Sequence, residues 1–167
     1  AEQHQWVHCQ KEHAVKWAIK TQRLFDGTGS PVVRDALVVI ENAHIVAVGP
    51  ASQVALPEGT ALLDVGERLV LPGMIDAHVH LLWSGSVSSG QESKVATDSQ
   101  ALLMGARNAQ MALKSGLTTV RDCGDRNYLS LALRDCINHG DLAGPRMLCS
   151  GPVITSTAGQ LWWQSIE

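Results

Sequence analysis

Hydrophobic and polar residues alternate along much of residues 14–71, which is the pattern of strands that bury one face. Within residues 14–21, for example, Trp17 and Ile19 alternate with Lys16 and Lys20. The pattern predicts short strands over residues 14–21, 36–40, 44–48, 61–65 and 68–71. The second and third are separated by three residues and form a hairpin, so we expect this part of the chain to be a small antiparallel sheet.

After Pro72 the period changes, and strand-like runs alternate with helix-like runs. A helix capped by Asp98 or Ser99 would place Leu102, Ala106, Ala109 and Leu113 on one face. A strand over 117–122 follows, then a helix over 128–139 that Gly140 closes, and a third strand over 146–150. The inward residues of the second helix are predicted to be Leu129, Leu133, Cys136 and Ile137. This order predicts an α/β fold with a parallel sheet.

The strand that opens this second part carries two imidazoles. Residues 74–81 read as a buried strand, on which Asp76, His78 and His80 share one face between apolar neighbours. A Ser/Gly loop over 84–90 follows, so both histidines lie near the carboxyl end of the strand, where α/β folds place their chemistry. Burying a polar group without a partner costs on the order of 2 to 7 kcal/mol. A shared divalent cation is the leading interpretation, and two hydrogen-bonded core histidines are the alternative.

Three blocks of sequence resemble the amidohydrolase superfamily of metal-dependent hydrolases. Residues 71–80 read Leu-Pro-Gly-Met-Ile-Asp-Ala-His-Val-His, which is similar to the first-strand signature of that superfamily. Residues 115–122 resemble its second strand. Residues 144–155 resemble its third strand and following loop, in the branch of prolidase-like peptidases and imidazolonepropionase relatives.

The resemblance implies the amino-terminal part of a (β/α)8 TIM barrel, preceded by part of a small β-sandwich. We expect a flexible segment over 1–13, the sandwich portion over 14–71 and the first three βα units over 72–167. A complete barrel takes about 250 residues. The chain is therefore expected to be the first portion of a longer enzyme, or one of two assembling pieces. A self-sufficient 167-residue domain is the alternative to a fragment. The alternative function is that of a non-catalytic truncated piece that binds metal weakly or acts only in assembly.

The resemblance carries His78 and His80 over as ligands of the more buried of one or two divalent ions, most simply zinc. Asp76 is expected to orient His80 or a neighbouring backbone group, or to be a structural carboxylate at the barrel floor. The remaining ligands and the general base are expected beyond Glu167. The implied reaction is hydrolysis of an amide bond, in a dipeptide or a small cyclic amide, by a metal-activated water.

The loop after the third strand departs from the family pattern. The prolidase-like branch continues with two glycines and a histidine, where this chain has Ala158, Gly159 and Gln160. Gln160 forms hydrogen bonds but does not titrate near neutral pH, so the substrate is expected to differ. Trp162 is a second candidate for the substrate loop, with core packing as the alternative.

Composition restricts the partners. The 167 residues are 45% hydrophobic and carry a net charge of -3, with 13 basic and 16 acidic residues and no basic run. We therefore expect no nucleic acid as partner, and because no apolar run approaches the roughly 20 residues that span a bilayer, no membrane either. The resemblance implies a small-molecule or dipeptide substrate. A homo-oligomer or a complementary chain that completes the barrel is also expected.

The spacing of the cysteines bears on the compartment of the protein. The four cysteines form no Cys-x-x-Cys pair, so we interpret them as buried free thiols and favour the cytoplasm. The first residue is Ala rather than Met, so a removed signal peptide is an alternative.

Asp122 ends the second barrel-like strand, where its carboxylate is expected to accept hydrogen bonds from loop amides.

Overall fold

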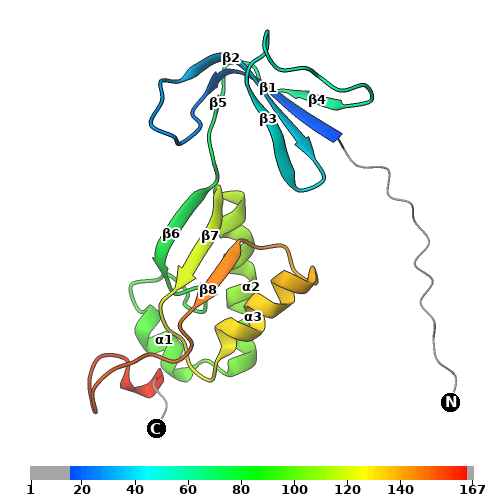
Figure 1. Ribbon diagram of the computed structural model, residues 1–167. Helices are drawn as coiled ribbons and strands as arrows, with labels where there is room; N and C mark the ends of the chain where they lie inside the picture. The colour runs from blue at the N-terminus through cyan, green and yellow to red at the C-terminus, as the bar shows by residue number, and fades with distance from the viewer. Residues whose placement is uncertain (1–15, 165–167) are drawn as a thin grey trace, which may run out of the picture. The chain divides into compact units, whose positions relative to one another are not determined.

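The computed structural model describes residues 16–164, which form two compact units that divide between Pro72 and Gly73 (Figure 1). The segment expected over residues 1–13 lies outside the described residues. None of the helices in the described part of the chain is both long enough and apolar enough to cross a bilayer.

The first unit is a sheet with the strand order β3-β2-β1-β4, in which β5 also pairs with β1. The predicted hairpin is confirmed, because β2 pairs antiparallel with both β1 and β3. The prediction of an all-antiparallel sheet is wrong, since β4 and β5 run parallel to β1. After β3 the chain returns through residues 51–60 to the opposite side of β1, which gives β4 the direction of β1. The strands are β1 Lys16–Leu24, β2 Val33–Glu41, β3 His44–Pro50, β4 Ala61–Asp64 and β5 Leu69–Val70.

Both faces of this sheet bury apolar side chains at β2. Leu37 and Val39 pack with Ala18 in one cluster, whereas Val38 packs with Leu24 in another. Because successive strand residues face opposite sides, an uninterrupted buried run such as residues 36–39 means that β2 is covered on both faces.

The second unit has the β-α-β-α-β order that the sequence predicts. Strands β6 Met74–Val79, β7 Leu117–Asp122 and β8 Arg146–Cys149 form a parallel sheet in that order. Helices α2 Asp98–Lys114 and α3 Leu129–His139 pack against one face of it, as Figure 1 shows. The buried core between helices and sheet consists of Leu81, Ala109, Val120, Leu133 and Met147. The other face of the sheet is open in the described chain, so β6 is not the fully enclosed strand that its sequence predicts, and Ile75 is 71% exposed.

Helix α2 begins one or two residues earlier than predicted. Thr97, rather than Asp98 or Ser99, is its N-cap, because the Thr97 hydroxyl accepts a hydrogen bond from the Gln100 amide at 3.2 Å. The Gln100 side chain accepts the Thr97 amide in return at 2.9 Å, which completes a capping box. A Thr-x-x-Gln spacing in the sequence carries this signal.

The predicted face of α2 is confirmed at Ala109, Leu102 and Ala106, which contact the core, but the fully buried stripe is centred on smaller residues. It consists of the small residues Ala101, Gly105 and Ala109, whereas Leu113 at the end of the helix is 36% exposed. A β-carbon on Gly105 would lie 3.1 Å from the Leu133 side chain, so the small residues let α2 approach α3 closely. Leu102 and Ala106 pack at the edge of this stripe.

Helix α3 ends as predicted, with Gly140 in the left-handed conformation at φ +85°. Leu129 and Leu133 are buried, but Cys136 is exposed and the prediction that it faces inward is wrong. Helical geometry accounts for this difference, because at about 100° per residue position 136 lies outside the edge of the stripe formed by residues 129, 130 and 133.

A short helix, α1 Ser89–Val95, replaces part of the loop predicted over 84–90. It buries no residue, so it has no hydrophobic period from which to predict it. Instead, the Glu92 carboxylate accepts hydrogen bonds from the hydroxyls of Ser86 and Ser88 at 2.7 and 2.6 Å. Hydrogen bonds from Ser84, Ser88 and Ser86 lower the pKa of Glu92 to about 2.

Candidate metal centre

The carboxyl ends of β6, β7 and β8 meet at one edge of the parallel sheet. Figure 1 shows that the three strands point toward the end where α1 and the short 3-10 helix η1 Trp162–Gln164 lie. His78 lies in β6 and His80 directly follows it, so both imidazoles are at this edge.

The two imidazole rings are neighbours. Their centroids are 5.4 Å apart and their planes meet at 74°. His78 is exposed, and its backbone amide donates to the Asp76 carboxylate at 3.0 Å. Of the roles expected for Asp76, the structure therefore shows a bond to a neighbouring backbone group.

His80 is more firmly held than His78. Its Nδ1 lies 3.0 Å from the carbonyl oxygen of Gly124, in the loop after β7. One face of the ring stacks on Trp83 at a centroid distance of 4.6 Å and an angle of 16°. The hydrogen bond to the Gly124 carbonyl and the stack on Trp83 together fix the orientation of the His80 ring. The hydrogen bond uses Nδ1, so Nε2 is the other ring nitrogen and does not take part in it.

The chain just after His80 is anchored to α2. The side-chain amide of Asn108 donates to the carbonyl oxygens of Leu81 and Trp83 at 2.8 and 2.7 Å. Both partners flank the first turn of the loop, in which the Trp83 amide donates back to the His80 carbonyl at 3.2 Å. The backbone that carries His80 is thus held from the helix side as well as from β7.

Asp122 is the buried carboxylate beneath this site, with 0% of its surface exposed. As predicted, it accepts hydrogen bonds from loop amides: Leu81 donates at 2.9 Å and Gly124 at 3.2 Å. Burial raises the pKa of Asp122, and the nearby charge of Asp125 raises it further. The two amide hydrogen bonds and the neighbouring His80 act in the opposite direction.

Asp125 and Arg126 are structural residues of this edge that the sequence alone does not single out. Asp125 is 1% exposed and accepts the backbone amide of Ser130 in the first turn of α3. Arg126 donates to the carbonyl of Ser93 in α1 at 2.9 Å and pairs with Asp98 of α2 at 3.0 Å. An acidic residue shortly before the helical run of residues 129–139 is the only signal of this role in the sequence.

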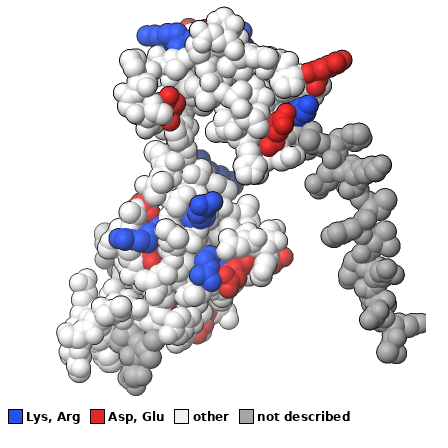
Figure 2. Space-filling model, viewed as in Figure 1, with Lys and Arg blue, Asp and Glu red and all other residues white. Residues whose placement is uncertain are grey.

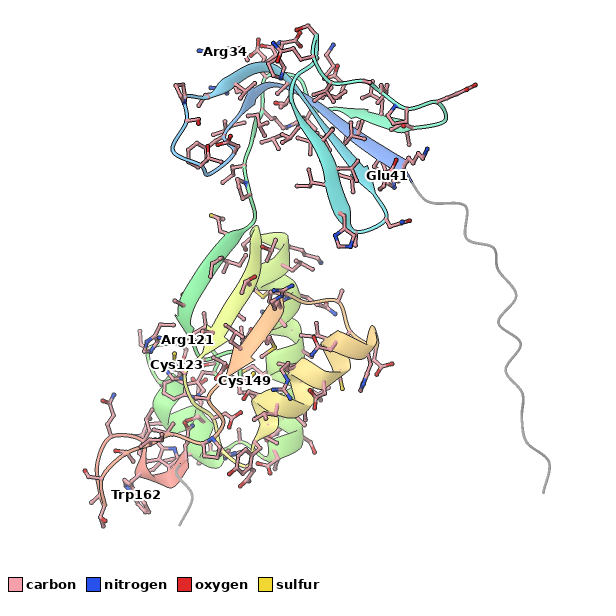
Figure 3. All side chains as sticks on the ribbon, viewed as in Figure 1. Arg34, Glu41, Arg121, Cys123, Cys149 and Trp162 are labelled. Atoms are coloured by element: carbon pink, nitrogen blue, oxygen red, sulfur yellow. The ribbon has the colours of Figure 1, made fainter. Side chains whose placement is uncertain are left out.

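The predicted substrate-loop residues lie in the segment that follows β8. Gln160 is exposed, and Trp162 is 48% exposed in η1, beyond the strand ends (Figure 3). The next residue, Trp163, receives Lys94 of α1 over its ring at 4.5 Å. Buried Gln164 reaches Ser93 at 3.4 Å, so the end of this segment contacts α1.

A hollow of about 320 Å³ lies on the open face at the ends of β7 and β8. Arg121, Cys123 and Cys149, which are labelled in Figure 3, line it together with Asp122, Leu148 and Ser150. The guanidinium of Arg121 donates to the Ala77 carbonyl of β6 at 2.7 Å, so this hydrogen bond joins β7 to β6 beside the hollow. In Figure 2, Lys and Arg side chains lie scattered among uncharged atoms on the face shown.

The described cysteines are free thiols that differ in environment, contrary to the expectation that all are buried. Burial raises the pKa of Cys149, whereas Cys136 is exposed on α3. Because the thiolate is the reactive form, iodoacetamide at about pH 8 should alkylate Cys136 several-fold faster than Cys149. Mass spectrometry of peptides sampled over time measures both rates. Faster labelling of Cys149 than of Cys136 would contradict the burial of the Cys149 thiol.

The donor set of the site is two imidazoles. Within residues 16–164, no group of three or more His, Cys, Asp or Glu side chains is placed to hold a metal ion. A catalytic zinc generally has three protein ligands and a water. The pair therefore fits a metal as part of a larger ligand set. The hydrogen bond from one ring nitrogen of His80 to a backbone carbonyl is typical of metal-bound histidines, which coordinate through the other nitrogen.

The second unit is an α/β unit with a parallel β-α-β-α-β sheet. Its imidazole pair lies at the carboxyl end of the first strand, where such sheets bind their ligands. The sequence profile of the Amidohydrolase family matches residues 69–162, which is more than half of the chain. The chain belongs to the amidohydrolase family.

Curated relatives cover part of the chain. An imidazolonepropionase from an Arthrobacter species is 40% identical over 68 residues, which are 41% of this chain and 16% of that protein. An imidazolonepropionase from Stenotrophomonas maltophilia is 34% identical over 98 residues, 58% of this chain and 22% of that protein. The matches thus span less than a quarter of the length of these relatives.

Solved structures resemble more of the chain. A Xaa-Pro dipeptidase with bound methionine has a TM-score of 0.67 and 28% identity, over 81% of this chain and 33% of that one. Molinate hydrolase has a TM-score of 0.71 and 28% identity, over 81% of this chain and 30% of that one. Ochratoxinase from A. niger has a TM-score of 0.74 and 25% identity, over 89% of this chain and 34% of that one.

Proposed function

We propose that this chain supplies the first metal ligands of a metal-dependent hydrolase that cleaves C–N bonds. The observation that carries the proposal is the pair His78 and His80 at the end of β6, with the Nδ1 of His80 bonded to a backbone carbonyl. That bond orients the ring and favours coordination through its other nitrogen, as in metal-bound histidines.

His78 and His80 would hold one divalent ion, most simply zinc, because neutral imidazole is a ligand that zinc accepts readily. When bound, such an ion lowers the pKa of a water toward neutrality and polarises a scissile carbonyl. The chain's own contribution is to orient His80 through Gly124 and Trp83, and to hold the backbone of His78 through Asp76.

The sheet supports a barrel architecture for the whole enzyme. The second unit has three parallel strands with helices on one face, an arrangement that the first three βα units of a (β/α)8 barrel would also have. We propose that the remaining ligands and the general base come from the other strands of that barrel. These strands would belong to a longer protein or to a complementary chain, and the whole enzyme is proposed to be a homo-oligomer or such an assembly.

The proposed substrate class is a small molecule or dipeptide with an amide bond. The similar proteins named imidazolonepropionase and Xaa-Pro dipeptidase support a C–N bond in a small substrate rather than a polymer. Gln160 and Trp162 are proposed to contact the substrate, because both are exposed on the segment after β8.

Metal removal tests the proposal on the complete protein. Xaa-Pro dipeptides and small cyclic amides would be assayed before chelation, after chelation and after zinc is returned. We expect activity to disappear with the metal and to return with zinc, while the 167-residue chain alone is inactive and binds zinc weakly. Hydrolysis that persists in verified metal-free protein would refute a metal-dependent reaction.

A further inference from the structure

We propose that Asp122 is a positioning residue that sets the tautomer of His80 through the Gly124 carbonyl. Its significance for metal binding rests on the proposed function, but the tautomer itself is a property of the metal-free chain.

The first step is the chemistry of the bond between His80 and Gly124. A backbone carbonyl oxygen only accepts hydrogen bonds, so the ring nitrogen 3.0 Å from it must carry the proton. In the neutral imidazole, Nδ1 is then the N–H and Nε2 holds the lone pair. His80 is therefore presented to a metal through Nε2.

The second step is what holds the Gly124 carbonyl in place. Asp122 accepts the amide of Gly124 with one carboxylate oxygen and the amide of Leu81 with the other. One buried carboxylate thus joins the residue after His80 to the residue whose carbonyl binds the His80 ring. Among the described residues, the hydrogen bonds of Asp122 go to backbone amides and not to the imidazole, so its hydrogen-bonded connection to the ring passes through the backbone.

The third step is the local backbone of Gly124. It has φ +147°, and a β-carbon there would lie 2.5 Å from the Val153 side chain. The loop takes this close path because residue 124 has no side chain. The amide of Cys123 also donates to the Val79 carbonyl at 2.9 Å, which joins the loop after β7 to the end of β6.

We call the hydrogen bonds that join Asp122, Gly124 and His80 the relay. Two substitutions test it from its two ends. Asp122→Asn replaces one acceptor oxygen with an NH₂ group, which faces a backbone N–H and cannot bond to it. Gly124→Ala places a β-carbon 2.5 Å from the Val153 side chain at φ +147°, so we expect the backbone of residue 124, and with it the carbonyl, to shift. Asp64→Asn is the matched control, because Asp64 accepts the amide of Gly66 at 2.8 Å in the first unit.

Long-range ¹H–¹⁵N spectra of the metal-free, histidine-labelled chain, recorded where the nitrogen shifts themselves report neutral imidazole, show which ring nitrogen carries the proton. We expect His80 to be the Nδ1–H tautomer in the unaltered chain and to gain the Nε2–H form in Asp122→Asn and in Gly124→Ala. Asp64→Asn should leave the His80 signals unchanged. His80 as Nε2–H in the unaltered chain, or an unshifted tautomer in a folded Asp122→Asn chain, would overturn the proposal.

Zinc titration of the complete protein gives the second readout. Misplacing the partner of a ligating histidine typically lowers metal affinity 10- to 100-fold, and we expect that loss for Asp122→Asn but not for Asp64→Asn. A complete protein that binds no zinc, yet whose His80 tautomer responds as described, would reject the proposed function and leave the relay standing. Unchanged zinc affinity beside an unchanged tautomer would reject the relay alone.

Discussion

Alanine at both His78 and His80 is expected to abolish metal retention and hydrolysis together in the complete protein. The two rings are the imidazole donors at the carboxyl end of β6, and their centroids are 5.4 Å apart. Removing both leaves too few ligands for the three-residue set that a catalytic zinc generally uses. We expect zinc affinity to fall by more than about 100-fold, beyond the loss caused by removing a hydrogen-bonding partner of a ligand. Elemental analysis after dialysis and assay of the same sample measure both effects.

His139→Ala is the control for the loss of an imidazole elsewhere in the same unit. His139 is an exposed residue in the last turn of α3, so its replacement should leave metal content unchanged. Full zinc content in the His78→Ala/His80→Ala protein would contradict the ligand assignment.

Leu133→Ala is expected to destabilise the second unit by about 2–5 kcal/mol, the usual cost of truncating a buried leucine. Leu133 is 3% exposed and packs in the cluster that contains Ala109 of α2, Val120 of β7 and Met147 of β8. A cavity at this point would weaken the contact of both long helices with the sheet. Urea unfolding followed by far-UV circular dichroism measures the change, because the helices of the described chain all lie in this unit.

Leu103→Ala provides the comparison, since Leu103 lies on α2 and is 73% exposed. Its unfolding free energy should change by no more than about 0.5 kcal/mol. Equal effects of the two substitutions would mean that α2 and α3 do not pack on the sheet as described.

The order of strands and helices was predictable because each has a local periodic signal. Residues 117–122 form β7 with the predicted bounds, and Gly140 ends α3 as expected. The parallel pairing of β4 with β1 was not predictable, because it depends on the path of residues 51–60 between strands. Helix α1 escaped prediction for a similar reason, since hydroxyl–carboxylate bonds to Glu92 accompany it rather than buried apolar residues.

The candidate site was predictable where strand alternation governs it and not where loops do. Alternation in residues 74–81 placed His78 and His80 together, and their rings are indeed adjacent. The stack of Trp83 on His80 depends on a turn held by a residue of α2, and no spacing in the sequence encodes it. The role of Asp125 in the first turn of α3 likewise requires the folded loop, because the acceptor and Ser130 are five residues apart.

The hydrogen bonds from Asn108 to the carbonyls of Leu81 and Trp83 divide the loop after β6 into a part that is held by α2 and a part that is not. The three residues after His80 are clamped to a long helix, whereas the chain from Ser84 onward is not held by this clamp. Insertions or deletions after Trp83 can therefore reshape the rim of the site without displacing the imidazole. The rim of this site is free to diversify in length while the ligand geometry beneath it stays constant.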